Sequence, residues 1–407
     1  MSKRRQKGKG KSQRRVKDWH VRYQAGEEVS DQVARGRKLA QRGVKLPPGR
    51  LEAPEENLEE LPKREGLVVA VFQRGTSVRI DGQERFCAIA KTFRAPAASS
   101  PLAVGDVVTV AVTQEHHIDG QRDIDRDRAE GFLLARRPRE TALTRPRPTS
   151  GKRLDPYRTQ VFEQVIAANM DCLLIVASTR QPPLRPRLIE RFLIVAERGE
   201  LEPLLAINKI DLQRPDPQVV AELRALDMEV ILTSAVTGEG LDALRRHLAG
   251  QRSVLAGASG VGKSTLINAI VPGADAATRS VRMKDERGRH TTAGAAVYDL
   301  PAPSDAKRAA AASPGAGAAE LPIGVGAGGI LVDTPGVREL GVAIDLDELP
   351  WYFPEFEPFV AHCRFNNCTH THEPDCAVLA AVEAREIPLR RYESYLRIRQ
   401  SLEERTG

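Results

Sequence analysis

The chain is 407 residues long, which is enough for two or three domains with ordinary cores. Its formal net charge of +7 favours an acidic partner such as nucleic acid. No apolar stretch is long enough for a signal peptide or a membrane span, so we expect neither secretion nor contact with a membrane. The lack of such a stretch, together with cysteines that form no disulfide framework, predicts a cytoplasmic protein. We expect it to be a monomer.

Residues 1–63 form a basic segment with few apolar residues at its start, too few to build a core. We expect a disordered arm that contacts phosphate backbones, with a solubilising tail or an organelle transit peptide as alternatives. The basic residues at its start are Lys3, Arg4, Arg5, Lys7, Lys9, Lys11, Arg14, Arg15 and Lys17.

Residues 64–145 are predicted to form a small β-barrel of the OB-fold type. Between 66 and 113, short apolar runs such as Gly66–Val71 and Gly105–Val110 alternate with turns that contain glycine. The loop Asp119–Asp125 is more charged than a tight connection needs.

Residues 146–345 alternate strand and helix patterns, which predicts a mainly parallel sheet covered by helices. We expect strands at Asp171–Val176 and Leu204–Ile207, and an amphipathic helix at Pro186–Arg198. Residues 301–328 are rich in Ala, Gly and Pro and are predicted to be an insertion at a hairpin tip between Val297 and Ile330.

A phosphate-binding loop follows the apolar run Arg252–Ala256 and opens a predicted helix. Glycines at both ends allow backbone N–H groups to turn toward a β-phosphate. The Lys263 ammonium is placed to reach the β- and γ-phosphates, and the Ser264 hydroxyl to ligate Mg²⁺. The residues of this loop are Gly257, Ala258, Ser259, Gly260, Val261, Gly262, Lys263, Ser264 and Thr265.

A guanine-reading motif follows another apolar strand. Its Asp211 carboxylate would accept hydrogen bonds from guanine N1–H and N2–H₂, a donor pair that adenine lacks. The Lys209 stem would lie over the base, and Asn208 would tie the motif to the phosphate loop. Ser234 and Ala235, after the next strand, complete this site.

The segment Asp333-Thr334-Pro335-Gly336 supplies two further groups. Asp333 would hold Mg²⁺ through water, and the Gly336 N–H would sense the γ-phosphate. Upstream, either Thr291 or Thr292 is expected to complete the Mg²⁺ shell when GTP is bound.

The residue after Gly336 is Val337, which cannot orient water by hydrogen bonding as a glutamine would. We therefore expect slow intrinsic hydrolysis of GTP, with another residue or a partner supplying the orienting group. His290 is the candidate within the chain, although a lone histidine is more often only solvated.

The order of the motifs is itself informative. The guanine-reading motif precedes the phosphate loop, whereas the linear order of GTPases is the reverse. The sequence therefore predicts a circularly permuted GTPase that uses GTP/GDP and Mg²⁺.

Residues 346–407 are predicted to form a zinc-binding helical domain. Three thiols and an imidazole within fourteen residues match a closed tetrahedral zinc site, with His362 and His372 as alternative ligands. The four predicted ligands are Cys363, Cys368, His370 and Cys376. Cys87 and Cys172 lie in apolar runs and are expected to be inert. Residues 377–403 read as helical, with arginines such as Arg391 on the polar surface.

Taken together, residues 64–400 resemble the RsgA (YjeQ) family of circularly permuted GTPases that act in late maturation of the small ribosomal subunit. Besides the motifs above, the resemblance rests on Ile166–Asp171, Val337-Arg338-Glu339 and Cys363-Arg364-Phe365. It implies an OB-fold, a central permuted GTPase domain and a zinc domain, GTP hydrolysis triggered by the small (30S) subunit, binding of its rRNA, and a catalytic role for His290.

Two rival functions remain. One is a nucleotide-gated RNA-binding protein whose hydrolysis is incidental; the other is an ATPase or kinase built on the same phosphate loop. The first predicts RNA binding that survives loss of Lys263, and the second predicts a preference for ATP over GTP.

Overall fold

A computed structural model describes residues 58, 60–72, 75–95, 100–113, 129–146, 163–226, 228–274, 295–302, 322–334 and 346–406. The chain divides into two compact units, with the boundary between Ala343 and Ile344. The basic arm, the charged loop Asp119–Asp125 and the centre of the 301–328 insertion lie outside the described residues. Within those residues, no helix combines the length and the hydropathy that crossing a membrane requires.

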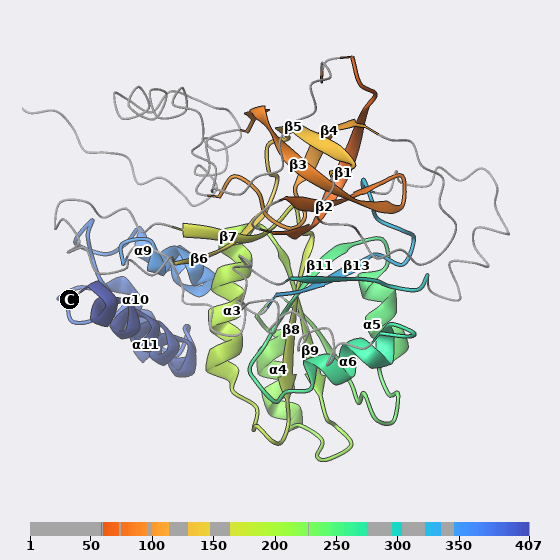
Figure 1. The fold of residues 1–407 in the computed structure, drawn as a ribbon. Helices are drawn as coiled ribbons and strands as arrows, with labels where there is room; N and C mark the ends of the chain where they lie inside the picture. The colour runs from red at the N-terminus through yellow and green to blue at the C-terminus, as the bar shows by residue number, and fades with distance from the viewer. Residues whose placement is uncertain are drawn as a thin grey trace, which may run out of the picture. The chain divides into compact units, whose positions relative to one another are not determined.

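Five strands at the start of the larger unit close into a barrel, as the sequence predicted (Figure 1). They are β1 (Lys63–Val71), β2 (Thr76–Ile80), β3 (Gln83–Arg94), β4 (Val107–Val112) and β5 (Gly131–Arg136), in the order β1-β2-β3-β5-β4. The turn Asp81-Gly82 joins β2 to β3 with positive φ at both residues, the geometry that matches the twist of a two-residue hairpin. Inward-facing valines and leucines, among them Val68, Val110 and Leu133, fill the barrel.

A two-stranded sheet of β6 (Ala142–Pro146) and β7 (Glu163–Ala168) follows the barrel. Just after β7, the Asn169 side chain donates to the Gly105 carbonyl at 2.9 Å and accepts from the Glu140 N–H at 2.9 Å. Next, Asp171 accepts from the Arg252 N–H and guanidinium, each at 2.7 Å. The segment Ile166–Asp171 therefore serves to join the barrel to the sheet that follows.

The central sheet has six strands in the order β10-β9-β8-β11-β13-β12. They are β8 (Cys172–Ser178), β9 (Glu202–Asn208), β10 (Glu229–Leu232), β11 (Arg252–Ala256), β12 (Ala296–Asp299) and β13 (Ile330–Asp333). All neighbours are parallel except β12 and β13, which form the antiparallel pair expected around the insertion. Every residue of β8 and β11 is buried, which explains the apolar runs Cys172–Ala177 and Val254–Ala256 within them.

Among the described residues, four helices connect these strands: α3 (Pro186–Gly199), α4 (Pro217–Arg224), α5 (Leu241–Leu248) and α6 (Lys263–Ile270). The predicted helix from Pro186 is confirmed as α3, which has proline in its first turn and ends at Glu200 in the left-handed conformation. Asp216 caps α4 by accepting from the Gln218 N–H at 2.9 Å. Leucines of α5 and α6, including Leu244 and Leu266, pack in one cluster with strand residues.

The smaller unit contains η3 (Leu349–Tyr352), η4 (Pro354–Phe356), α9 (Glu357–Val360), α10 (Ala377–Glu383) and α11 (Leu389–Thr406). The prediction of continuous helix over 377–403 was wrong in its middle: the chain leaves the helix between α10 and α11, where Arg385 has φ 63° and Pro388 follows. Proline disfavours helical geometry in the residue before it, so a break here is expected. The Arg391 side chain is also not on the surface, since it stacks 4.6 Å over Phe353 and pairs with Glu355 at 2.6 Å.

Candidate functional site

The carboxyl ends of four parallel strands bring the predicted nucleotide motifs to one edge of the sheet. The phosphate loop follows β11, the guanine motif follows β9, Ser234 follows β10, and Asp333 ends β13. Open α/β sheets bind ligands at this edge. Because β8 separates β9 from β11, the loop after β8 lies between the two principal motifs.

The phosphate loop has the backbone shape that its glycines allow. Gly257 and Gly262 have φ values of 142° and 95°, in the left-handed region that side chains disfavour. A Cβ at Gly257 would lie 2.3 Å from the Val176 carbonyl oxygen, and one at Gly262 would lie 2.5 Å from Asn208 Nδ2. Neither position therefore tolerates a side chain.

Lys263 begins α6 and is buried, with 8% of its surface exposed. Its Nζ donates to the Gly257 and Ala258 carbonyl oxygens at 2.7 and 2.6 Å. The ammonium is thus held inside the curve of the loop. Ser264 is half-buried one position further along the helix.

The guanine motif is locked onto the phosphate loop through Asn208. Asn208 Nδ2 donates to the Val261 carbonyl oxygen at 3.1 Å, and its Oδ1 accepts from the Ala235 N–H at 3.2 Å. Asn208 is 2% exposed, so both bonds are shielded from water. The hydrogen bond to Val261 is the contact between the two motifs that the sequence predicted for Asn208.

The Asp211 carboxylate is exposed and oriented by one neighbour. Its Oδ1 accepts from the Ser234 hydroxyl at 2.6 Å, and Ser234 Oγ in turn accepts from the Thr237 N–H at 3.1 Å. Ser234 is fully buried. A fixed, solvent-facing carboxylate is the group needed to accept two parallel hydrogen bonds from guanine.

Two residues of the loop after β8, Thr179 and Gln181, contact Lys209 of the guanine motif, and no motif in the sequence points to either of them. The Thr179 hydroxyl donates to the Lys209 carbonyl oxygen at 3.0 Å. The Lys209 ammonium donates to the Gln181 carbonyl and, at 2.6 Å, to the Gly260 carbonyl of the phosphate loop. Lys209 itself has φ 63°, a conformation that costs a non-glycine residue free energy unless its surroundings hold it. The loop after β8 provides part of that support.

The remaining nucleotide residues are only partly covered by the structure. Asp333 ends β13 beside β11, since it pairs in register with Leu255. His290, Thr291, Thr292 and Gly336 lie outside the described residues, so their predicted roles stay predictions.

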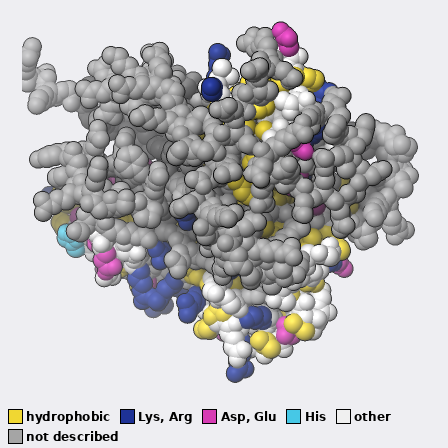
Figure 2. Space-filling view, viewed as in Figure 1, with side chains coloured by type: hydrophobic (Ala, Val, Ile, Leu, Met, Phe, Trp, Pro, Cys, Tyr) yellow, Lys and Arg dark blue, Asp and Glu magenta, His cyan; other side chains and the backbone are white. Residues whose placement is uncertain are grey.

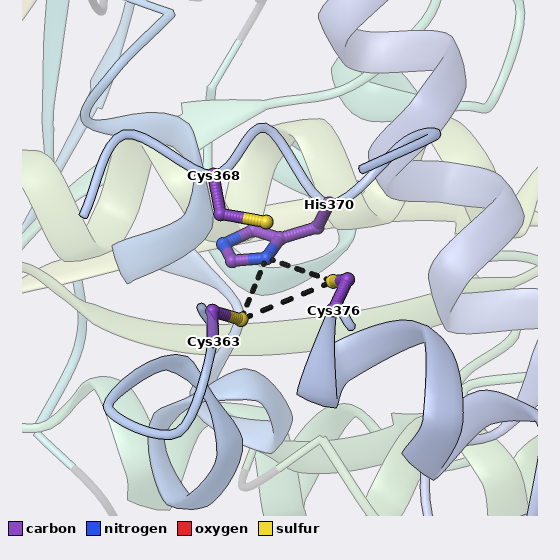
Figure 3. A group of neighbouring side chains, drawn as sticks. All are labelled: Cys363, Cys368, His370 and Cys376. Atoms are coloured by element: carbon purple, nitrogen blue, oxygen red, sulfur yellow. Dashed lines mark hydrogen bonds between the residues drawn. The ribbon is translucent and has the colours of Figure 1, made fainter. Parts of the chain in front are cut away.

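In the smaller unit, Cys363, Cys368, His370 and Cys376 converge on one point (Figure 3). Their ligand atoms all lie within 4.8 Å of one another. Cys363 Sγ lies 3.9 Å from Cys376 Sγ, and His370 Nδ1 lies 3.6 and 3.5 Å from these two sulfurs. A tetrahedral zinc ion would set these separations at about 3.8 Å for two sulfurs and about 3.6 Å for sulfur and nitrogen. Cys363, His370 and Cys376 therefore already lie at the separations of a tetrahedral site, and Cys368 is close enough to supply the fourth ligand.

His370 is the histidine that joins this cluster, rather than either alternative. It is 1% exposed, and burial lowers its pKa, so the imidazole is neutral and able to bind a metal. His372 is exposed and its Nδ1 contacts the Thr371 hydroxyl at 2.8 Å instead. Burial raises the pKa of the Cys368 thiol to about 12, a shift that a bound dication would oppose.

Hydrogen bonds and aromatic rings hold the cluster in place. Tyr392 Oη donates to the His370 carbonyl at 2.9 Å, and Tyr395 Oη donates to the Thr369 carbonyl at 2.7 Å. Phe356 packs edge-on against both His370 and Tyr395. The ligand loop is thus built into the core of the unit.

Known proteins share this combination of sequence and fold. A family model described as RsgA GTPase matches residues 136–322. A protein of Gemmatimonas aurantiaca named small ribosomal subunit biogenesis GTPase RsgA is 38% identical over 305 residues, covering 74% of this chain and 84% of that protein. The chain belongs to the RsgA GTPase family. A Bordetella pertussis protein of the same name is 36% identical over 340 residues, covering 82% of this chain and 95% of its own length.

Two solved structures agree with the fold. YjeQ from Thermotoga maritima is 28% identical, with a TM-score of 0.56 over 84% of this chain and 99% of that chain. YloQ, described as a circularly permuted GTPase, is 25% identical, with a TM-score of 0.53 over 87% of this chain and 99% of its own. As a member of the RsgA GTPase family, the chain is a GTP-hydrolysing enzyme with a circularly permuted nucleotide domain.

The position of Thr179 gives a prediction for this member of the RsgA GTPase family. Thr179→Val keeps the shape of the side chain but removes the donor to the Lys209 carbonyl. One lost hydrogen bond is worth about 0.5–1.5 kcal/mol, so we expect the affinity for GTP and GDP to fall about two- to tenfold. Both nucleotides should be affected equally because they share the base. Titration with fluorescent GTP and GDP analogues measures this, and Thr179→Ser is the control that keeps the hydroxyl. Unchanged affinity, or a loss confined to GTP, would contradict the role.

Proposed function

We propose that the chain hydrolyses GTP in late maturation of the small (30S) ribosomal subunit, binding the subunit and its rRNA in the GTP state and leaving after subunit-stimulated hydrolysis. The observation that carries the nucleotide part is the Asn208 bridge to the phosphate loop, which joins a guanine reader to a phosphate cradle in one site. The names of the relatives support the ribosomal part.

The residues present fit a guanine nucleotide with Mg²⁺. The cradle at Gly257 and Gly262 leaves no room for a side chain, and the Lys263 ammonium lies inside the curve of the loop, where it donates to the Gly257 and Ala258 carbonyl oxygens. Ser264, Asp333 through water, and Thr291 or Thr292 would hold Mg²⁺, which would neutralise charge on the phosphates. In this proposal His290 orients the attacking water, since Val337 cannot.

Zinc is the metal that we propose for the cluster Cys363, Cys368, His370 and Cys376. The four residues supply three thiols and one imidazole within 4.8 Å of one another, and a set of four protein ligands of this kind is typical of structural zinc.

The domain limits proposed from the sequence are 64–145 for the barrel, 146–345 for the GTPase domain and 346–407 for the zinc domain. Residues 334–345 separate the end of β13 from the described start of the smaller unit at residue 346. Gly336 lies in this connecting segment, so loss of the γ-phosphate there would act on the segment that leads directly to the zinc domain.

Basic side chains support affinity for RNA phosphates. Figure 2 shows dark blue Lys and Arg side chains gathered on the described surface. Arg185 and Arg187, at the start of α3, are exposed. Binding to RNA through such groups weakens steeply as salt rises.

The rate of GTP hydrolysis, with and without isolated small ribosomal subunits, tests this function. We expect slow turnover alone and stimulation of at least about 100-fold, since partner-supplied groups can raise hydrolysis by roughly 10³–10⁵. His290→Ala should remove most of the stimulation and leave nucleotide affinity intact, whereas His247→Ala, an exposed histidine of α5, should do neither. Absence of stimulation of the wild type would point to a different RNA partner.

A further inference from the structure

The smaller unit carries a cavity of about 250 Å³ beside the metal cluster, and two of the cluster's ligands, Cys368 and His370, form part of its lining. Trp351 and Phe365 supply aromatic walls, and Asn366, Asn367 and Arg399 supply polar groups. The volume is below the roughly 300–1,000 Å³ of pockets that enclose drug-sized ligands. It suits a flat group no larger than a single ring system.

The metal cluster fixes one wall of this cavity. The residues Arg364 to Asn367 lie between two of the ligands, Cys363 and Cys368, and all four are exposed (Figure 3 shows the two ligands). The Cys368 N–H donates to the Phe365 carbonyl at 3.2 Å, which closes a tight turn. With both ends held, the turn cannot withdraw its side chains into the small core.

Phe365 is therefore an aromatic ring presented to solvent from a rigid support. Its side chain is 39% exposed, which makes it one of the few large exposed apolar residues among those described. The Arg364 guanidinium lies 5.5 Å from the centre of the ring and is itself held by Asp375 at 2.9 Å. An exposed ring flanked by a guanidinium is a surface on which a base can stack.

The polar lining favours a base over a phosphate. The side-chain amides of Asn366 and Asn367 each offer donors and an acceptor, which match the edge of a base. Asp347 also lines the cavity, and its carboxylate would repel a phosphate but accept from a base amino group. Arg399 is largely engaged by Glu403 at 3.0 Å, so it does not make the cavity strongly cationic.

We propose that this cavity binds one unpaired nucleobase of a single-stranded RNA segment, stacked on Phe365 and beside Trp351. This inference rests on the proposed function, because it names the form of RNA that the metal-binding unit takes. A base within a duplex is stacked on its neighbours and cannot enter, so the site selects single-stranded RNA.

Trp351 offers a reporter inside the cavity. The chain has two tryptophans, Trp19 and Trp351, so a full-length Trp19→Phe protein emits from Trp351 alone. We would titrate it with a short mixed-sequence single-stranded oligoribonucleotide and with the duplex of the same sequence. We expect the single strand to quench Trp351 emission saturably and the duplex to cause at least tenfold weaker quenching, as an order-of-magnitude expectation.

Substitutions of Phe365 then locate the contact. Phe365→Ala should weaken binding of the single strand by about 5- to 150-fold, the range expected for loss of one stacked base, and Phe365→Tyr should restore it. Leu389→Ala is the matched control, since Leu389 is a 62% exposed apolar residue of the same unit outside the cavity. Metal content measured for every variant excludes loss of the cluster as the cause.

Equal binding by Phe365→Ala and wild type, or equal quenching by single strand and duplex, would overturn the proposal. These results are separable from failure of the proposed function. If small subunits stimulate hydrolysis but no oligoribonucleotide quenches Trp351, the cavity proposal alone fails; if the oligonucleotide binds but subunits do not stimulate, the ribosomal function fails.

Discussion

Lys263→Ala is expected to lower GTP hydrolysis by at least about 100-fold, the size of effect seen when one preorganised group facing transition-state charge is removed. The ammonium lies inside the curve of the phosphate loop, held between the Gly257 and Ala258 carbonyls. Its removal takes away one of the positive charges, beside the proposed Mg²⁺, that would stabilise the charge developing on the β- and γ-phosphates. Single-turnover release of phosphate from radiolabelled GTP measures the effect.

Lys91→Ala is the matched control, because Lys91 is an exposed lysine of the barrel strand β3. It should hydrolyse GTP as the wild type does. The melting temperature of each variant separates loss of the charge from loss of the fold. Wild-type hydrolysis by Lys263→Ala would refute the assignment of this loop.

The same variant separates a cycling enzyme from a nucleotide-gated RNA-binding protein whose hydrolysis is incidental. If hydrolysis drives release, Lys263→Ala should fail to support subunit maturation. If RNA binding alone is the function, the Lys263→Ala variant should still bind RNA and should still support subunit maturation. A non-hydrolysable GTP analogue provides a second comparison, since equal affinity for small subunits with the analogue and with GDP would contradict nucleotide-controlled binding.

Local motifs made most of the nucleotide site predictable. The phosphate loop is contiguous in sequence, and its glycines are required by backbone angles that any such loop must adopt. The guanine motif was equally plain, because its residues follow a recognisable apolar strand. Their reversed order was sufficient to predict the permutation, since the sheet places β9, β8 and β11 side by side whatever their order along the chain.

Residues whose contacts depend on which strands are neighbours in the sheet were not predictable from local motifs. Thr179 is a threonine after a buried strand, and no pattern near it signals a function. Its role arises because β8 lies between the strands that carry the two motifs, which brings its hydroxyl to the Lys209 carbonyl. The choice of His370 over His372 was likewise decided by three-dimensional geometry, because both histidines have acceptable spacing from the cysteines.

Removal of the metal is expected to unfold the smaller unit while the nucleotide site survives. The buried aromatic cluster of Phe353, Phe356 and Tyr395 is joined to the ligand loop, since Phe356 and Tyr395 both pack against His370. A segment of this size has little core to stabilise it, whereas a structural zinc ion contributes apparent binding free energies of about 10–16 kcal/mol in small domains. The free energy lost with the ion should therefore exceed the free energy of folding that the unit has left, and the unit should unfold.

A strong chelator tests this in the full-length protein, as does Cys376→Ser without chelator. Near-ultraviolet circular dichroism should lose the signal of the aromatic residues around His370, and protease should cut within residues 346–406. Affinity for GDP should stay within about twofold, since the nucleotide site belongs to the other compact unit.

Cys172→Ala is the control for thiol chemistry. Burial raises the pKa of the Cys172 thiol to about 12, so this residue is a neutral part of the sheet and no ligand. It should keep its full metal content, although the lost sulfur lowers the stability of the sheet. Unchanged dichroism and protease resistance after chelation would show that the aromatic core holds the unit without metal. Joint loss of GDP binding would show instead that the nucleotide unit depends on the metal-bound one for its fold.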